Sequence, residues 1–78
     1  GFATGKHDLR MRADRISEFL ADGDKVRIDM RLRGREKAHG ALAMEKFKEF
    51  LAMIPAEFSL ESPPRRFPQG FIAIISKK

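Results

Sequence analysis

Positively charged side chains gather in one segment of this sequence, residues 23–44. From Lys25 to Met44, after Asp24, the segment contains only two acidic residues, Asp29 and Glu36, and its cations are Lys25, Arg27, Arg31, Arg33, Arg35 and Lys37. This excess of four charges (six minus two) is most of the formal net charge of +5. Arginine suits phosphate because its planar guanidinium donates to two oxygens at once, and it also stacks on bases. The cluster predicts an anionic partner, of which nucleic acid is the commonest.

The strongest candidates for phosphate binding lie where the alternation of the segment ends. Alternating apolar residues predict a strand over residues 25–33, and Arg31 and Arg33 would project from its polar face. Arg35 follows in a turn where Gly34 lets the backbone bend. Arg27 on the same strand could serve only as a charged guard against edge-to-edge aggregation.

A second pair of arginines, Arg65 and Arg66, lies in residues 62–69, which contain three prolines. This composition predicts a loop, and its stiff backbone could present both arginines to RNA. An ordinary exposed turn explains the pair equally well. Phe67 beside them could stack on a base, although such a residue more often packs back onto the core.

Residues suited to catalysis are poorly represented. The chain has two histidines and no cysteine, which excludes disulfides, thiolate metal sites and cysteine nucleophiles. His39 lies near a predicted helix start, where capping or packing is the simplest role. No glycine-rich phosphate loop is present. We expect a non-enzymatic protein without catalytic residues, metal, cofactor or small-molecule substrate. An enzyme would need a pocket that holds His39 beside a carboxylate.

Length and composition limit the class of protein. A chain of 78 residues forms one domain at most and buries roughly 60 % of its unfolded surface. No apolar run approaches the roughly 20 residues that span a bilayer, and a signal-peptide pattern is missing. We expect a cytoplasmic protein with no membrane partner.

The first element that would position these cations is an amphipathic helix from an N-cap at Asp8 to a stop at Gly23. Phe19 would widen its apolar stripe, which recurs at helical spacing as Leu9, Ala13, Ile16 and Leu20. The strand over residues 25–33 follows. We expect residues 1–7 to be a tail or a truncated strand.

A second helix and two strands complete the pattern. Pro55 would end the helix, whose apolar residues are Ala43, Phe47, Phe50 and Ile54 with Leu42 and Leu51 beside them. Residues 56–60, with Phe58 and Leu60, alternate as a short strand, and the apolar run 70–76 predicts a central strand. The order helix, strand, helix, strand, strand predicts an α/β (α+β) two-layer sandwich.

Both helices should pack on one face of a small mixed β-sheet. The strand–helix–strand unit should form a right-handed crossover between parallel strands, and the last two strands an antiparallel hairpin.

With these features the sequence resembles the C-terminal domain of bacterial translation initiation factor 3. The resemblance is specific in combination and clear over residues 8–51, after which only the order of elements matches. It rests on Phe19-Leu20, Gly23-Asp24-Lys25, Arg31-Leu32-Arg33-Gly34-Arg35-Glu36, Ala38-His39 and Met44-Glu45.

The resemblance implies that residues 8–78 bind the small (30S) ribosomal subunit through 16S ribosomal RNA. Such a domain would prevent premature subunit association and support start-codon and initiator tRNA selection. The resemblance also implies RNA contacts by Arg31, Arg33 and Arg35, with a weaker contact by Lys25.

Three departures from the family pattern concern this chain. The family's domain opens with a further strand that is largely missing here, and the N-terminal domain and its lysine-rich linker are also missing. Gln69 stands where the family commonly has arginine, so Arg65 or Arg66 would have to replace that RNA contact. Leu51 stands where a basic residue is usual.

A generic basic α/β module that binds other RNA or an acidic protein is the alternative function.

Overall fold

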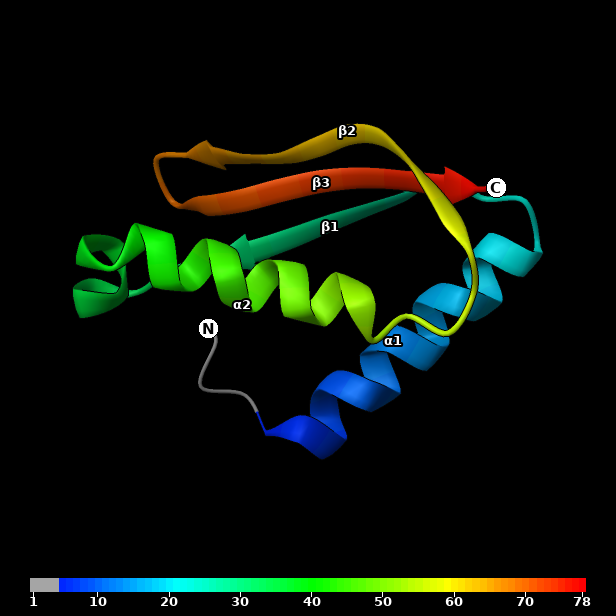
Figure 1. Cartoon of the computed structure of the whole chain (residues 1–78), viewed down its shortest axis with the longest axis horizontal. Helices are drawn as coiled ribbons and strands as arrows, with labels where there is room; N and C mark the ends of the chain where they lie inside the picture. Colours follow the sequence, from blue (N-terminus) through cyan, green and yellow to red (C-terminus); the bar gives the residue numbers. More distant parts are fainter. Residues whose placement is uncertain (1–4) are drawn as a thin grey trace.

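The computed structural model describes residues 5–78 and confirms the order helix, strand, helix, strand, strand (Figure 1). One short 3-10 helix, η1, was not predicted. The elements are α1 Lys6–Ala21, β1 Val26–Arg31, η1 Gly34–Ala38, α2 Gly40–Ala52, β2 Phe58–Phe67 and β3 Gly70–Lys77. Residues 1–4 lie outside the described part, so the predicted N-terminal tail or truncated strand falls largely there. Lys6 and His7, which were assigned to it, belong to α1.

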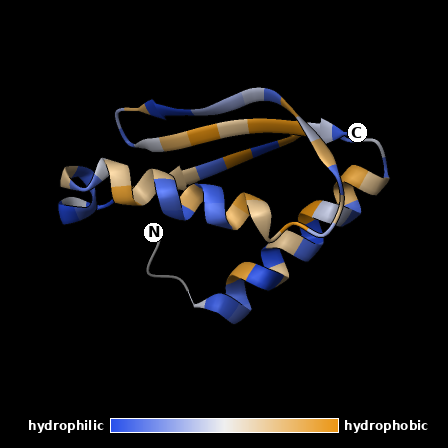
Figure 2. Ribbon diagram, in the orientation of Figure 1, coloured by the Kyte–Doolittle hydropathy of each residue, from blue (hydrophilic) through white to orange (hydrophobic). Residues whose placement is uncertain are grey.

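The strands form one sheet in the order β1-β3-β2, and both neighbouring pairs are antiparallel. The α+β class and the central position of β3 are confirmed, but the expectation of a mixed sheet is wrong. β1 and β2 run in the same direction, yet β3 lies between them and prevents a parallel pair. The central place suits β3 because its sequence is apolar on both faces, as Figure 2 shows.

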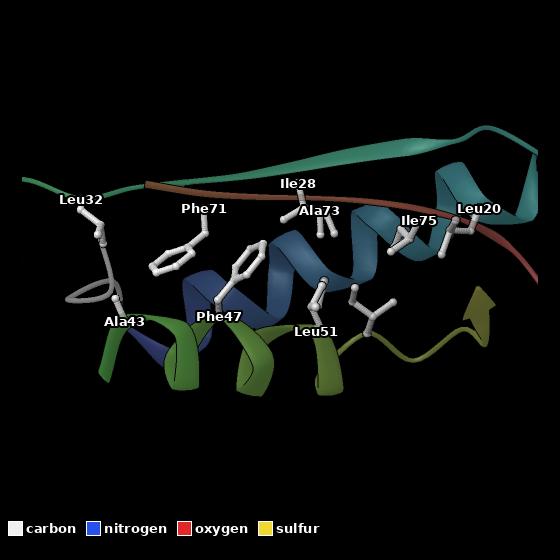
Figure 3. Packing of buried hydrophobic residues seen from close by; sticks show 11 residues of the cluster. Leu20, Ile28, Leu32, Ala43, Phe47, Leu51, Phe71, Ala73 and Ile75 are labelled. Carbon is white, nitrogen blue, oxygen red and sulfur yellow. The ribbon is translucent and has the colours of Figure 1, made fainter. Parts of the chain in front are cut away.

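The core lies between one face of the sheet and the two helices (Figure 3). The rings of Phe47 and Phe71 stack at its middle with centroids 6.3 Å apart. Such a pair contributes about 0.5–1.5 kcal/mol beyond its buried area. The buried apolar residues are Ala13, Leu20, Ile28, Leu32, Ala43, Phe47, Leu51, Ile54, Phe71, Ala73 and Ile75.

The ends of α1 differ in how well the sequence predicts them. The helix begins earlier than expected, with Gly5 as N-cap and Asp8 in the first turn, where a carboxylate favours the helix dipole. The C-terminal stop at Gly23 is confirmed. The N–H of Gly23 donates to the Leu20 carbonyl at 2.9 Å and that of Asp24 to the Phe19 carbonyl at 3.1 Å. These two bonds are the Schellman motif.

Three apolar residues that were assigned to or beside buried stripes are exposed: Phe19 at 46%, Leu42 at 44% and Leu60 at 49%. Phe19 and Leu42 each lie one residue from a buried neighbour, and one residue turns a helical side chain by about 100°. Leu60 lies on the edge strand β2, beside a shift in its register with β3.

The proline-rich stretch is not a loop, contrary to the prediction. β2 runs through it to Phe67, and only Pro68 and Gln69 form the turn to β3. Proline is tolerated because β2 is an edge strand and because its pairing with β3 shifts between Ser62 and Arg65. β2 is therefore longer than predicted.

β1 ends at Arg31, two residues earlier than predicted, so Arg33 does not project from the strand. The Leu32 N–H still donates to the Gln69 carbonyl at 2.8 Å. Beyond that bond the chain turns away into η1.

Gly70 permits the close approach of β1 to the start of β3. A Cβ at this position would overlap the carbonyl oxygen of Met30 and lie 3.0 Å from the Cα of Arg31. We expect Gly70→Ala to lower the free energy of unfolding by about 2 kcal/mol, because the strands must separate. Urea unfolding followed by circular dichroism measures this change.

The control is Gly5→Ala, since a Cβ there meets nothing within 4 Å. It should cost less than about 1 kcal/mol, the range for an N-cap change. Equal losses in the two variants would contradict the close-approach explanation.

Candidate nucleic-acid interface

The end of β1 and the 3-10 helix η1 form a cationic turn, residues 31–37, which we call the basic turn. Arg31 is the last residue of β1, Arg33 is the extended link before η1, and Arg35 lies within η1. All three side chains are exposed. The structure therefore places Arg31, Arg33 and Arg35 together at one end of the sheet.

Local hydrogen bonds fix the shape of the basic turn. Gly34 has a φ of +47°, a conformation that glycine adopts without strain. The Arg33 N–H donates to Glu36 Oε1 at 2.8 Å, and the Glu36 N–H donates to the Arg33 carbonyl at 2.9 Å. The first of these bonds is one half of a capping box. Glu36 thus holds the turn closed, which explains a carboxylate among so many cations.

A shallow hollow of about 410 Å³ lies between the basic turn and the β2–β3 turn. Its lining contains no carboxylate and consists of Arg31, Leu32, Arg33, Gly34, Lys37 and Gln69. Arg31 Nη1 donates to Gln69 Oε1 at 3.1 Å, which links the two turns. An anionic group placed in this hollow would face three cations with no competing acid.

Lys37 also lines the hollow, which the sequence did not predict. It belongs to the cationic segment, of which the sequence favours only Arg31, Arg33 and Arg35 as RNA contacts. Arg33 directly precedes η1 and Lys37 lies within it, and both residues line the hollow. Arg35, by contrast, does not line the hollow.

Ion pairs within residues 5–78 leave the basic turn free. They are Lys25–Glu61 at 3.6 Å, Arg27–Asp29 at 3.7 Å and Lys46–Glu49 at 3.6 Å. All are solvent-exposed and contribute little to stability. In this described part the side chains of Arg33, Arg35 and Lys37 form no ion pair, so their charges are available to a partner.

Lys25 is not brought together with the other candidates. It directly precedes β1 and pairs with Glu61 of β2. Arg31 lies six positions further along the chain, which in a strand is a distance of about 20 Å. The structure places these two candidates at opposite ends of the sheet.

Arg65 and Arg66 lie on opposite faces of β2, because successive strand residues alternate. Arg65 is paired with Ile72 and lies on the face without helices. Arg66 is paired with Phe71 and lies on the helix side. Its guanidinium is 5.3 Å from the Phe71 ring centroid, and its Nη2 donates to the Lys37 carbonyl at 3.5 Å. Arg66 therefore braces the basic turn against the sheet.

A catalytic or metal site finds no support in the part of the chain that is described. His39 is exposed, lines neither of the hollows at Arg31 and Arg65, and its side chain makes no capping hydrogen bond. Residues 5–78 contain no group of three or more histidines and carboxylates that could hold a metal ion. None of their helices has the length and apolarity that a bilayer requires.

Comparison with known proteins decides the family. The model of the translation initiation factor IF-3, C-terminal domain, matches residues 1–78. This chain belongs to that family. The match also covers residues 52–78, where the resemblance had reduced to a shared order of elements. A family of translation initiation factors agrees with the expectation of a non-enzymatic protein.

Individual relatives give the same result. The translation initiation factor IF-3 of Clostridium perfringens is 37% identical over 73 residues, which are 94% of this chain and 41% of the relative. That of Neisseria meningitidis is 40% identical over 81 residues, covering 100% of this chain and 44% of the relative. A chloroplastic IF-3 from Cyanidioschyzon merolae is 34% identical over 73 residues. The chain thus spans less than half the length of these relatives.

The bracing role of Arg66 predicts unequal effects for two adjacent arginines. Arg66→Ala should lower the free energy of unfolding by about 1 kcal/mol, because it removes the contact with Phe71 and the bond to Lys37. Arg65→Ala is the matched control and should change it by less than about 0.5 kcal/mol. Urea unfolding of both variants measures the difference, and equal values would contradict the assignment.

Proposed function

We propose that this domain binds the small ribosomal subunit by docking its basic turn on phosphates of 16S ribosomal RNA. The observation that carries the proposal is the hollow lined by Arg31, Arg33 and Lys37 without an acidic residue, in a chain of the IF-3 C-terminal family. The domain acts by occupying a site, with no chemical step.

The mechanism is electrostatic, with shape deciding the position. Each phosphate that a cation neutralises releases condensed counterions, which favours binding. The wide minor groove and backbone of an RNA helix are recognised mostly by shape and not by sequence. The Glu36 bond and Gly34 hold the backbone of the basic turn in one conformation. The turn therefore loses little conformational entropy when RNA binds.

The other predicted site residues take different parts in this proposal. Gln69 orients Arg31 through its side-chain oxygen, so Arg31 supplies the positive charge at that turn. Arg65 extends the RNA contact onto the face of the sheet without helices, and Lys25 contributes only to RNA that reaches the opposite end of β1 from Arg31. Arg66 acts indirectly, since it faces the helix side.

The role of the whole factor is also a proposal. By occupying the small subunit the domain would hinder early joining of the large subunit and support start-codon and initiator tRNA selection. The matched relatives are longer than this chain, and an N-terminal domain in the same factor stays a prediction. Since one relative is chloroplastic, we assign the domain to the compartment that holds its ribosomes, the cytoplasm in a bacterium.

Electrostatic docking predicts a steep salt dependence. If about six phosphates are neutralised, the affinity for isolated small subunits should fall about a thousandfold between roughly 50 and 200 mM salt, on the calibration for duplex DNA. Co-sedimentation across this range measures it. A flat response would exclude the electrostatic mechanism.

A double substitution tests the basic turn itself. Arg33→Ala with Lys37→Ala should weaken small-subunit binding by about a hundredfold, because two charge-assisted contacts are lost. The slope of log affinity against log salt should also shrink by about two. Neither side chain forms an ion pair within residues 5–78, so the fold should stay intact.

The matched control is Lys77→Ala with Lys78→Ala, which removes the same charge at the C-terminal end of β3. This control should retain most of the affinity. If the two double variants weaken binding equally, net charge and not the basic turn governs it. Equal binding of the unchanged domain to unrelated RNAs would favour the generic basic module.

A further inference from the structure

The sheet face opposite the helices carries a mixed set of cationic, aromatic and aliphatic side chains. The register places three rows across the strands β1, β3 and β2. These rows are Arg27, Ile74 and Ser62, then Asp29, Ile72 and Arg65, then Arg31, Gly70 and Phe67. Both helices lie on the other side of the sheet (Figure 1). We call this surface the open face.

A second shallow hollow, of about 400 Å³, lies on the open face. It is lined by Arg27, Arg65, Phe67 and Ile72 of the open face, together with Arg66, whose guanidinium lies over the Phe71 ring on the helix side. Phe67 and Ile72 are only partly buried although both are apolar. The hollow therefore has an apolar floor between two arginines, Arg27 and Arg65, that belong to opposite edge strands.

The charge of the open face selects an anionic occupant. Within the three rows Arg27, Arg31 and Arg65 stand against one carboxylate, Asp29, and the Arg27–Asp29 pair at 3.7 Å is solvent-exposed. An exposed pair of this kind exchanges partners at little cost. Beyond the rows, the Glu61 carboxylate accepts from the Ser76 hydroxyl at 3.0 Å and pairs with Lys25, so that end of the face adds no net charge. Since the floor is apolar and aromatic, the occupant must also offer flat apolar groups.

Single-stranded RNA meets both requirements. Its bases stack on aromatic side chains and its phosphates bind cations, whereas a duplex keeps its bases inside. We propose that the open face binds a single-stranded stretch of RNA, with a base on Phe67 and Ile72 and flanking phosphates on Arg27 and Arg65.

Arg31 connects this face to the basic turn. It follows Arg27 and Asp29 on the same face of β1, and it also lines the hollow of the basic turn. RNA docked at the basic turn can therefore continue as a single strand across the sheet. The inference goes beyond the proposed function, which gives this face only a contact by Arg65, because it adds base stacking and a single-stranded form of RNA.

A new fluorophore tests base stacking directly. The chain has no tryptophan or tyrosine, so Phe67→Trp introduces the sole strong emitter. An oligoadenylate of about ten nucleotides, within the usual site size, should quench this indole as its bases stack on it. Heparin, a polyanion without bases, should bind without quenching it.

Phe19→Trp is the matched control, because Phe19 is exposed on α1 and remote from the open face. Its fluorescence should not respond to the oligoadenylate. Equal quenching in both variants, quenching by heparin, or no quenching at saturating oligoadenylate would each overturn the proposal. Concentration-dependent quenching without RNA would instead identify an interface between copies of this chain.

A second variant keeps the inference testable if Phe67→Trp fails to fold. Phe67→Leu retains an apolar side chain but removes the aromatic ring, and should weaken oligoadenylate binding about tenfold in fluorescence polarisation. Heparin binding should stay unchanged, and an equal loss for both ligands would overturn the stacking. The variant Arg33→Ala with Lys37→Ala should lose small-subunit binding yet keep the Phe67→Trp quenching, so the two proposals fail separately.

Discussion

The whole arrangement depends on the burial of β3 between two antiparallel partners. This strand is apolar on both faces, so it is stable only where β1 and β2 pair with its two edges and the helices cover one side. Because both partners run against β3, the end of β1 and the end of β2 meet at its first residue, Gly70. The basic turn and the β2–β3 turn are neighbours for this reason, and a cationic hollow forms between them.

Strand alternation then places adjacent arginines on opposite faces of the sheet. Arg65 and Arg66 are adjacent in the sequence, yet one lies on the open face while the other contacts Phe71 and the basic turn. A side chain engaged with the core side serves the fold, whereas a side chain on the open face is available to a ligand. Residue type alone does not separate these roles, because the difference is one step along a strand.

The residues proposed to bind RNA and the residues of the core are different groups in this domain. The core is apolar, with Phe47 and Phe71 stacked at its centre, and contains no buried charged residue within the described chain. The basic turn lies outside it and is shaped by Gly34 and the Glu36 bond. Its side chains Arg33, Arg35 and Lys37 form no ion pair in residues 5–78, so removal of their charges breaks no salt bridge of the fold.

Short-range pattern determined the helices, the stop at Gly23, the polar face of β1 and the cluster of cations, because each depends on residues a few positions apart. Only the tertiary structure decided the antiparallel order of the sheet, the entry of the prolines into β2, and the partners of Arg66 and Lys37. These features depend on register between segments about thirty residues apart, as in the bond from Arg66 to Lys37. A sequence pattern carries the period of a strand but not the identity of the strand beside it.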